Sequence, residues 1–145
     1  MKKQYAIGAT LAVAGIAAAA VWSANLAGTG NGATTTLAGG PIADVILPET
    51  LSANAQLGKR GFEAKCAACH GINAAGREGI APPLVHIIYE PSHHGDESFQ
   101  RAAATGVRAH HWKFGNMPPV TGVTRSDVAM ITTYIREMQQ ANGIK

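Results

Sequence analysis

The two cysteines of the chain lie in one short run, Cys66-Ala67-Ala68-Cys69-His70. Two thiols three residues apart can add to the two vinyl groups of a haem, and the adjacent imidazole can then reach the iron from one side. The other readings are a redox dithiol, half of a zinc site, or a chance arrangement. A thioredoxin-like dithiol needs a βαβ context, and a zinc site needs further cysteines or a spaced histidine pair. The run therefore predicts one covalently bound haem c, attached through Cys66 and Cys69, with His70 as a ligand of its iron.

The sixth ligand of the iron decides the function, and Met117 is the leading candidate for it. A thioether sulfur favours Fe(II) and leaves no open position for oxygen or peroxide. Met117 is followed by Pro118 and Pro119, which stiffen its loop. The competing sulfurs are Met130 and Met138, but they fall on a predicted helix, where methionine is ordinary packing. Met117 as the ligand predicts electron transfer.

Five further histidines are an unusual number for so short a chain, and an imidazole would also serve as a sixth ligand, with a lower potential. They are His86, His93, His94, His110 and His111. We expect most of them to be solvated loop residues, because two adjacent histidines are a weak metal signal. Trp112 and Arg108 lie shortly before Met117 and are candidates to bind a haem propionate.

Two segments on either side of the haem-binding run have the spacing and end signals of helices. The first extends from about Leu51 to Cys66, so that its last turn leads into the run. The second begins at Asp96, which we expect to cap it, and ends before Gly106. Phe99 and the alanines of this second helix are predicted to face inward.

A third helix is predicted near the end of the chain. Thr124, with Asp127 three residues further on, resembles a capping box, and Gly143 lies just past the expected end. Apolar residues at three-and-four spacing form one face of this helix: Val128, Ile131, Tyr134, Ile135 and Met138. No segment shows a strand pattern, so the sequence predicts an all-α domain.

The start of the chain has the pattern of an export signal. Lys2 and Lys3 precede residues 5–22, which form an apolar stretch of 18 residues without a charge. Residues 1–24 are either a signal peptide that is removed or an uncleaved membrane anchor, because roughly 17 to 25 apolar residues can span a bilayer. Both alternatives predict a periplasmic protein, held at the inner membrane by residues 5–22 if the segment is kept.

Composition separates a linker from the domain and excludes one class of partner. Residues 25–48 form a flexible linker rich in Gly, Ala and Thr, and residues 49–145 form the domain. The formal charge of +3 includes Lys2 and Lys3, so the remainder carries 10 − 9 = +1. A nearly neutral chain with scattered signs predicts no nucleic-acid partner.

About residues 50–145 resemble the class I cytochrome c family. Gly58 and Phe62 look like the small and aromatic pair of the family's first helix, which packs against its last helix, here at Ile131 and Tyr134. The resemblance implies the cytochrome c fold, with about three to five helices around one covalently bound haem.

Two more pieces of sequence carry the resemblance after the haem-binding run. Pro82-Pro83-Leu84 resembles a Pro-x-Leu step, which implies that the Pro82 carbonyl accepts the ring N–H of His70 and that Leu84 packs on the haem. The run from Asn116 to Pro119 resembles the loop that supplies the methionine ligand, here Met117.

The family resemblance implies a monohaem carrier of single electrons with no small-molecule substrate. It would work as a shuttle or as the electron-transfer subunit of a larger oxidoreductase, with a dehydrogenase, reductase or oxidase as its partner. The alternative is a haem enzyme or gas sensor, whose sixth position is open or held by a displaceable ligand.

Overall fold

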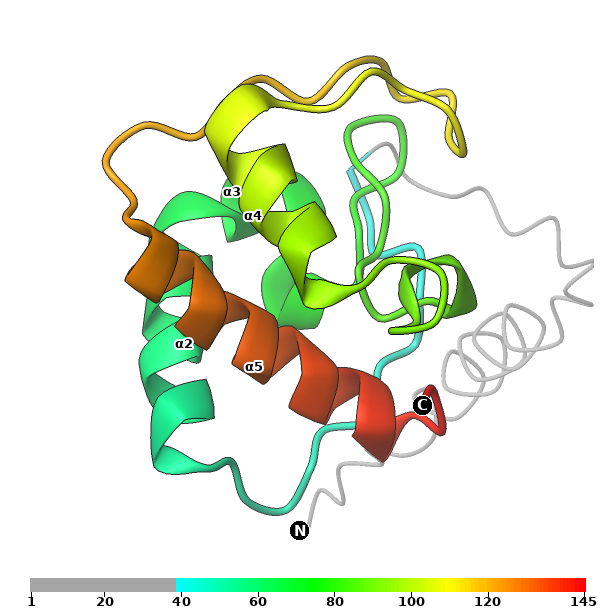
Figure 1. The fold of residues 1–145 in the computed structure, drawn as a ribbon. Coiled ribbons are helices and arrows are strands. Elements are labelled where there is room, and N and C mark those ends of the chain that lie inside the picture. Colours follow the sequence, from blue (N-terminus) through cyan, green and yellow to red (C-terminus); the bar gives the residue numbers. More distant parts are fainter. Residues whose placement is uncertain (1–38) are drawn as a thin grey trace, which may run out of the picture. The chain divides into compact units, whose positions relative to one another are not determined.

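The computed structural model describes residues 39–145, and their α-helices are arranged around a crossing of the first and the last (Figure 1). The α-helices are α2 (Ala53–Lys65), α3 (Ala67–His70), α4 (Asp96–Thr105) and α5 (Arg125–Ala141), with short 3₁₀ turns η1 (Ile72–Ala74) and η2 (Ile87–Tyr89). Within this part of the chain no strand forms, and only two isolated β-bridges occur. The predicted all-α class is therefore confirmed.

The predicted leader, residues 1–24, lies outside the described residues, as does the linker up to residue 38. Among the helices of residues 39–145, none combines the length and the apolar character that crossing a membrane requires.

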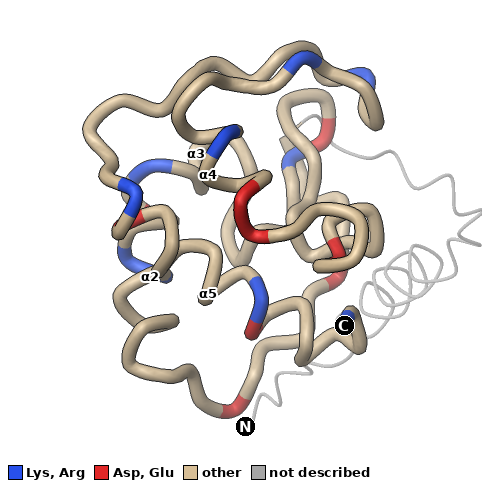
Figure 2. Tube along the Cα trace, in the orientation of Figure 1, with Lys and Arg blue, Asp and Glu red and all other residues tan. Residues whose placement is uncertain are grey.

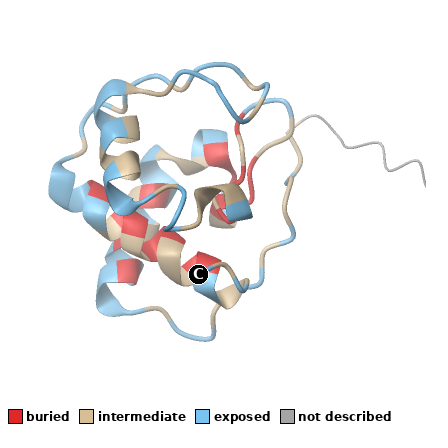
Figure 3. Ribbon diagram, turned by 45° about the vertical axis from the view of Figure 1, so that its right-hand side comes forward, coloured by how far each residue is buried: buried red, intermediate tan, exposed pale blue. Residues whose placement is uncertain are grey.

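The crossing of α2 and α5 forms the centre of the core. Phe62 on α2 and Tyr134 on α5 are 0% and 1% exposed, and their ring centroids lie 5.6 Å apart. A Cβ atom at Gly58 would come within 1.9 Å of the Met130 carbonyl oxygen, so only glycine lets the two backbones approach this closely. Figure 3 shows buried residues where these helices face each other. The pairing predicted for Gly58 and Phe62 is present.

Helix α5 follows its sequence signals closely. The Thr124 hydroxyl accepts a hydrogen bond from the Asp127 N–H, and the Asp127 carboxylate accepts one from the Thr124 N–H, which completes the predicted capping box. All five predicted apolar residues of this helix are buried: Val128, Ile131, Tyr134, Ile135 and Met138. The helix ends at Ala141, with Asn142 as its C-cap.

Helix α4 departs from the expectation at its start. Its N-cap is Gly95, and Asp96 is the first helical residue, so the prediction that Asp96 caps the helix is wrong. The carboxylate of Asp96 instead accepts a hydrogen bond from Nε of Arg136 on α5 at 2.9 Å. This charge-assisted bond occupies the carboxylate, which would otherwise be free to cap the helix. The negative charge of Asp96 still lies in the first turn, where it interacts favourably with the positive end of the helix dipole.

The inward face predicted for α4 is also only partly formed. No residue of the helix is buried. Phe99 is half-buried against the core cluster, and the Arg136 guanidinium lies 5.0 Å above its ring. Helix α4 is thus held to α5 at two places: Arg136 binds Asp96 and covers Phe99, and Arg125 binds the Glu97 carboxylate.

An extended arm precedes α2 and lies along the domain. The backbone N–H groups of Ile42 and Ala43 donate to the Ala75 carbonyl at 3.0 and 2.9 Å. Further along, the Asn142 side chain accepts from the Ile46 N–H and donates to its carbonyl, both at 2.8 Å. The arm is therefore hydrogen-bonded both to the loop after α3 and to the end of α5.

Replacing Gly58 with Ala should lower the free energy of unfolding by about 1–3 kcal/mol, because the added methyl group would overlap the Met130 carbonyl and force α2 away from α5. Guanidinium unfolding followed by circular dichroism measures this loss. Gly61→Ala is the matched control, since its Cβ would lie 3.1 Å from the movable Ile131 side chain and alanine gains about 1 kcal/mol in helix propensity. Equal stability of the two variants would contradict the close approach.

Candidate haem site

The two thiols and the imidazole of the haem-binding run are presented by the turn that joins α2 to α3. Cys66 is both the C-cap of α2 and the residue before α3, and its N–H donates to the Phe62 carbonyl at 2.8 Å. Both cysteines are free; Cys66 is half-buried and Cys69 is exposed. The run therefore starts directly from the core that α2 forms with α5.

Burial makes the Cys66 thiol a weak acid. Burial, and to a lesser extent the neighbouring Cys69, raise the pKa of Cys66 to about 11. Redox-active Cys-x-x-Cys pairs have instead a lowered thiol pKa, because the thiolate is the reactive form. Cys66 is therefore held in its protonated form at neutral pH.

The ring of His70 is fixed in position by the Pro82 carbonyl. Nδ1 of His70 lies 2.9 Å from this oxygen, to which its N–H donates, and the residue is 9% exposed. Burial lowers the pKa of His70, and the bond to Pro82 opposes part of this change. A neutral imidazole with Nδ1 protonated leaves the Nε2 lone pair free for a metal.

The loop that carries Pro82 is itself tied back to the turn after α3. The N–H groups of Leu84 and Val85 both donate to the Ala74 carbonyl, at 2.8 and 3.3 Å. Leu84 is half-buried and packs against the core cluster. The structure thus brings Pro82 to His70 and sets Leu84 at the edge of the core.

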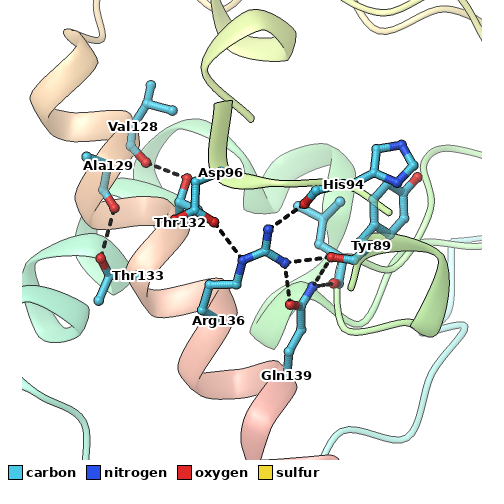
Figure 4. A network of polar contacts seen from close by, with 10 residues as sticks. Tyr89, His94, Asp96, Val128, Ala129, Thr132, Thr133, Arg136 and Gln139 are labelled. Atoms are coloured by element: carbon cyan, nitrogen blue, oxygen red, sulfur yellow. Dashed lines mark hydrogen bonds and ion pairs between the residues drawn. The ribbon is translucent and has the colours of Figure 1, made fainter. Parts of the chain in front are cut away.

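Two polar residues of α5 hold this loop in place, and sequence reasoning missed both. Gln139 is 1% exposed and donates to the carbonyls of Leu84 and Tyr89 at 2.8 and 3.0 Å. Arg136 donates to Gln139 and to the carbonyls of Tyr89 and His94 (Figure 4). The sequence does contain a signal for them: Arg136 and Gln139 are three residues apart and border the apolar face of the helix. Polar residues in such a position often make buried hydrogen bonds.

Met117 lies in the loop between α4 and α5. It exchanges two backbone hydrogen bonds with Val107, each 2.9 Å long, and is half-buried. A Cβ atom at Gly106 would come within 2.4 Å of the Met117 carbonyl oxygen, so the two sides of the loop are close together. The backbone that carries the sulfur is therefore held at a defined position.

The competing methionines belong to the helix crossing. Met138 is 1% exposed inside the core, and Met130 faces Gly58 through its carbonyl group. The Met138 side chain is therefore occupied in the core, which leaves Met117 and Met130 as the half-buried sulfurs.

Trp112 provides an independent indication of a bound group. Its indole N–H is the one buried side-chain donor or acceptor atom without a hydrogen-bond partner in the described part of the chain. The ring stacks on Phe114 at 5.7 Å and meets the edge of His86 at 5.2 Å. Buried polar groups are rarely left unpaired, so this N–H fits an acceptor such as a haem propionate. Arg108, the other propionate candidate, is exposed.

Tyr89 is the polar side chain near the indole of Trp112. Burial raises the pKa of Tyr89 to about 12, and Trp112 opposes part of this rise. The two side chains are thus neighbours, but the Trp112 N–H and the Tyr89 hydroxyl do not form a hydrogen bond of good geometry.

Two thiols, an oriented imidazole and an unpaired buried donor on an all-α domain define a c-type haem protein. The family model described as Cytochrome c matches residues 55–139, more than half of the chain, and the chain belongs to this family. Comparison with curated proteins and with solved structures found no match.

Replacing Trp112 with Phe removes the N–H donor and keeps a smaller aromatic ring at this position. If this donor binds a propionate, the haem-loaded variant should lose about 1–3 kcal/mol in free energy of unfolding. The pKa of the propionate should rise, so the pH-dependent part of the midpoint potential should move to higher pH. Unfolding followed in the Soret band and redox titrations at several pH values measure the two effects. An unchanged pH profile would show that the N–H has another role.

Proposed function

We propose that this protein is a monohaem c-type cytochrome that carries single electrons in the periplasm. Membership of the cytochrome c family indicates covalent haem and haem-based electron transfer. The observation that carries the proposal furthest is the contact between His70 Nδ1 and the Pro82 carbonyl, because it prepares the imidazole for an iron.

When bound, the haem supplies a one-electron Fe(III)/Fe(II) couple. Cys66 and Cys69 would hold it through thioether bonds, and His70 Nε2 and the Met117 sulfur would bind its iron. The Trp112 N–H would donate to a haem propionate and so give that buried carboxylate a hydrogen-bond partner.

A carrier works best when its surroundings change little as the iron changes charge, and the packing here supports that. The haem-binding turn continues directly from α2, whose Phe62 is fully buried against α5. The loop with Pro82 and Leu84 is fixed by Gln139. Rigid, fully hydrogen-bonded supports of this kind keep reorganisation small.

The location and the partners are inferred from the leader and from the surface. The export signal of residues 1–24 supports a periplasmic domain, free or anchored at the inner membrane. Positively and negatively charged residues alternate along the chain trace of the described residues (Figure 2), which fits brief contacts with a redox protein. Ile72, 75% exposed and two residues after His70, offers an apolar contact point. The partner is a dehydrogenase, reductase or oxidase. The protein exchanges electrons with it either as a free shuttle or as a subunit of the same complex.

The double variant Cys66→Ala with Cys69→Ala should lose covalent haem, because both thioether bonds need a thiol. The unaltered protein should carry the mass of one haem that acid-acetone does not extract, and intact-mass spectrometry gives both values. Retention of covalent haem in the double variant, or a mass gain of two haems in the unaltered protein, would contradict the proposal.

Replacing Met117 with Ala should open the sixth position of the iron. The oxidised protein should show the weak long-wavelength charge-transfer band of an iron–sulfur bond, and the reduced protein should not bind carbon monoxide. The variant should lose the band and bind carbon monoxide readily. Absorption spectra and carbon monoxide titrations measure these changes.

Met130→Ala is the control, since this half-buried methionine lies on α5. It should keep the band. Loss of the band in Met130→Ala but not in Met117→Ala would reject Met117 as the ligand. Fast carbon monoxide binding by the unaltered protein would favour the alternative function, a haem enzyme or gas sensor with an accessible iron.

A further inference from the structure

Two histidine pairs that are separate in the sequence meet on the surface. His93 and His94 lie in the turn before α4, and His110 and His111 lie in the loop after it. The ring centroids of His93 and His94 are both 5.2 Å from that of His111. One nitrogen from each of His93, His94 and His111 lies within 4.8 Å of the other two. The fold thus brings together three imidazoles whose positions in the sequence do not form a metal-binding motif.

The shortest nitrogen–nitrogen distance in this group matches the distance between two nitrogen ligands of one metal ion. Nε2 of His93 and Nε2 of His111 are 3.3 Å apart. Two nitrogens bound tetrahedrally to Zn²⁺, each about 2.0–2.1 Å from the ion, are separated by about 3.3–3.4 Å. A hydrogen bond between two imidazoles would also give this distance, but it would not explain the convergence of a third ring.

The third ring is held in the orientation that a ligand needs. Nδ1 of His94 lies 2.6 Å from the Ile88 carbonyl, to which it donates, so Nε2 is left with a free lone pair. Metal-binding histidines usually donate their other ring N–H to such an acceptor, which fixes the ring and its tautomer. His94 also meets the Tyr89 ring at 5.1 Å.

The backbone beneath His93 and His94 is fixed by α5. Their N–H groups both donate to the Glu90 carbonyl, at 3.1 and 2.8 Å. The Arg136 guanidinium binds the His94 carbonyl, as Figure 4 shows. Arg136 is in turn paired with Asp96, and its side chain is only 11% exposed. The turn is therefore built on a rigid support.

The opposite loop is also ordered by its own contacts. The Asn116 side chain accepts from the Ala109 N–H at 2.9 Å, above the paired backbones of Val107 and Met117. Nδ1 of His110 lies 2.8 Å from the Arg108 carbonyl. His111 is thus presented from a closed loop.

The group is accessible and is suited to a cation in its neutral form. His93 and His111 are exposed, and His94 is half-buried. A neutral imidazole is the form that binds metals, and three imidazoles suit zinc and copper but not magnesium or calcium.

We propose that His93, His94 and His111 form a surface site for one divalent transition-metal ion of the zinc or copper class. The ion joins the turn before α4 to the loop that leads to Met117. Three protein nitrogens leave a further coordination position open to solvent. The site is separate from the haem attachment and does not depend on the proposed electron transfer.

The test uses the haem-loaded protein without a histidine tag and Zn²⁺ as the probe. Isothermal titration calorimetry should give one site per chain, and Mg²⁺ should give no heat. His93→Gln and His111→Gln should each weaken Zn²⁺ binding at least about tenfold, because each removes a ligand. His110→Gln is the matched control in the same loop, and it should change the affinity less than about threefold.

Hydrogen exchange followed by mass spectrometry distinguishes a bridging ion from one bound to the adjacent pair alone. Zn²⁺ should slow exchange in peptides that cover both 88–95 and 107–116. Slowing of 88–95 alone would overturn the proposal, because His93 and His94 would then bind the ion without His111. The absence of binding, or an equal loss in His110→Gln, would overturn it as well.

Discussion

The close contact of α2 with α5 is the constraint on which the rest of this domain depends. It requires the absence of a side chain at Gly58, where the α2 backbone meets the Met130 carbonyl. Phe62, one turn further along α2, then packs against Tyr134 with the two rings tilted to each other. Because the haem-binding turn begins at the end of the same helix, the position of Cys66 is set by a glycine two turns earlier.

Helix α5 also organises the polar part of the structure. Arg136 and Gln139 bind main-chain carbonyls of the segment between α3 and α4, at Leu84, Tyr89 and His94. One helix therefore fixes the loop that orients His70, the turn that carries His93 and His94, and helix α4 through Asp96. A largely buried guanidinium with four hydrogen bonds and a buried amide with three favour a single geometry for this arrangement. Losing one of them would leave several carbonyls unpaired at once.

Sequence reasoning succeeded where the physical signal is local. The capping box of Thr124 and Asp127 and the apolar spacing of α5 are contained within a few residues, and both predict the helix correctly. The same kind of signal failed at Asp96, since a residue forty positions away competes for its carboxylate. The contact between His93 and His111 could not be predicted from the sequence for the same reason. It depends on how the segments before and after α4 fold relative to each other. Met117 as the iron ligand stays a prediction from the sequence.

The Asn142 side chain has a mechanical consequence. It clamps the backbone of Ile46, a residue 96 positions earlier, through two hydrogen bonds at once. A pull applied to the chain ahead of residue 39 would load this clamp and the bonds of Ile42 and Ala43 to Ala75. These bonds lie at successive points of the arm, so those of Ile42 and Ala43 would have to break before the force reached Ile46. The arm can therefore act as a strain relief, so that tension on the N-terminal side dissipates before it reaches α2.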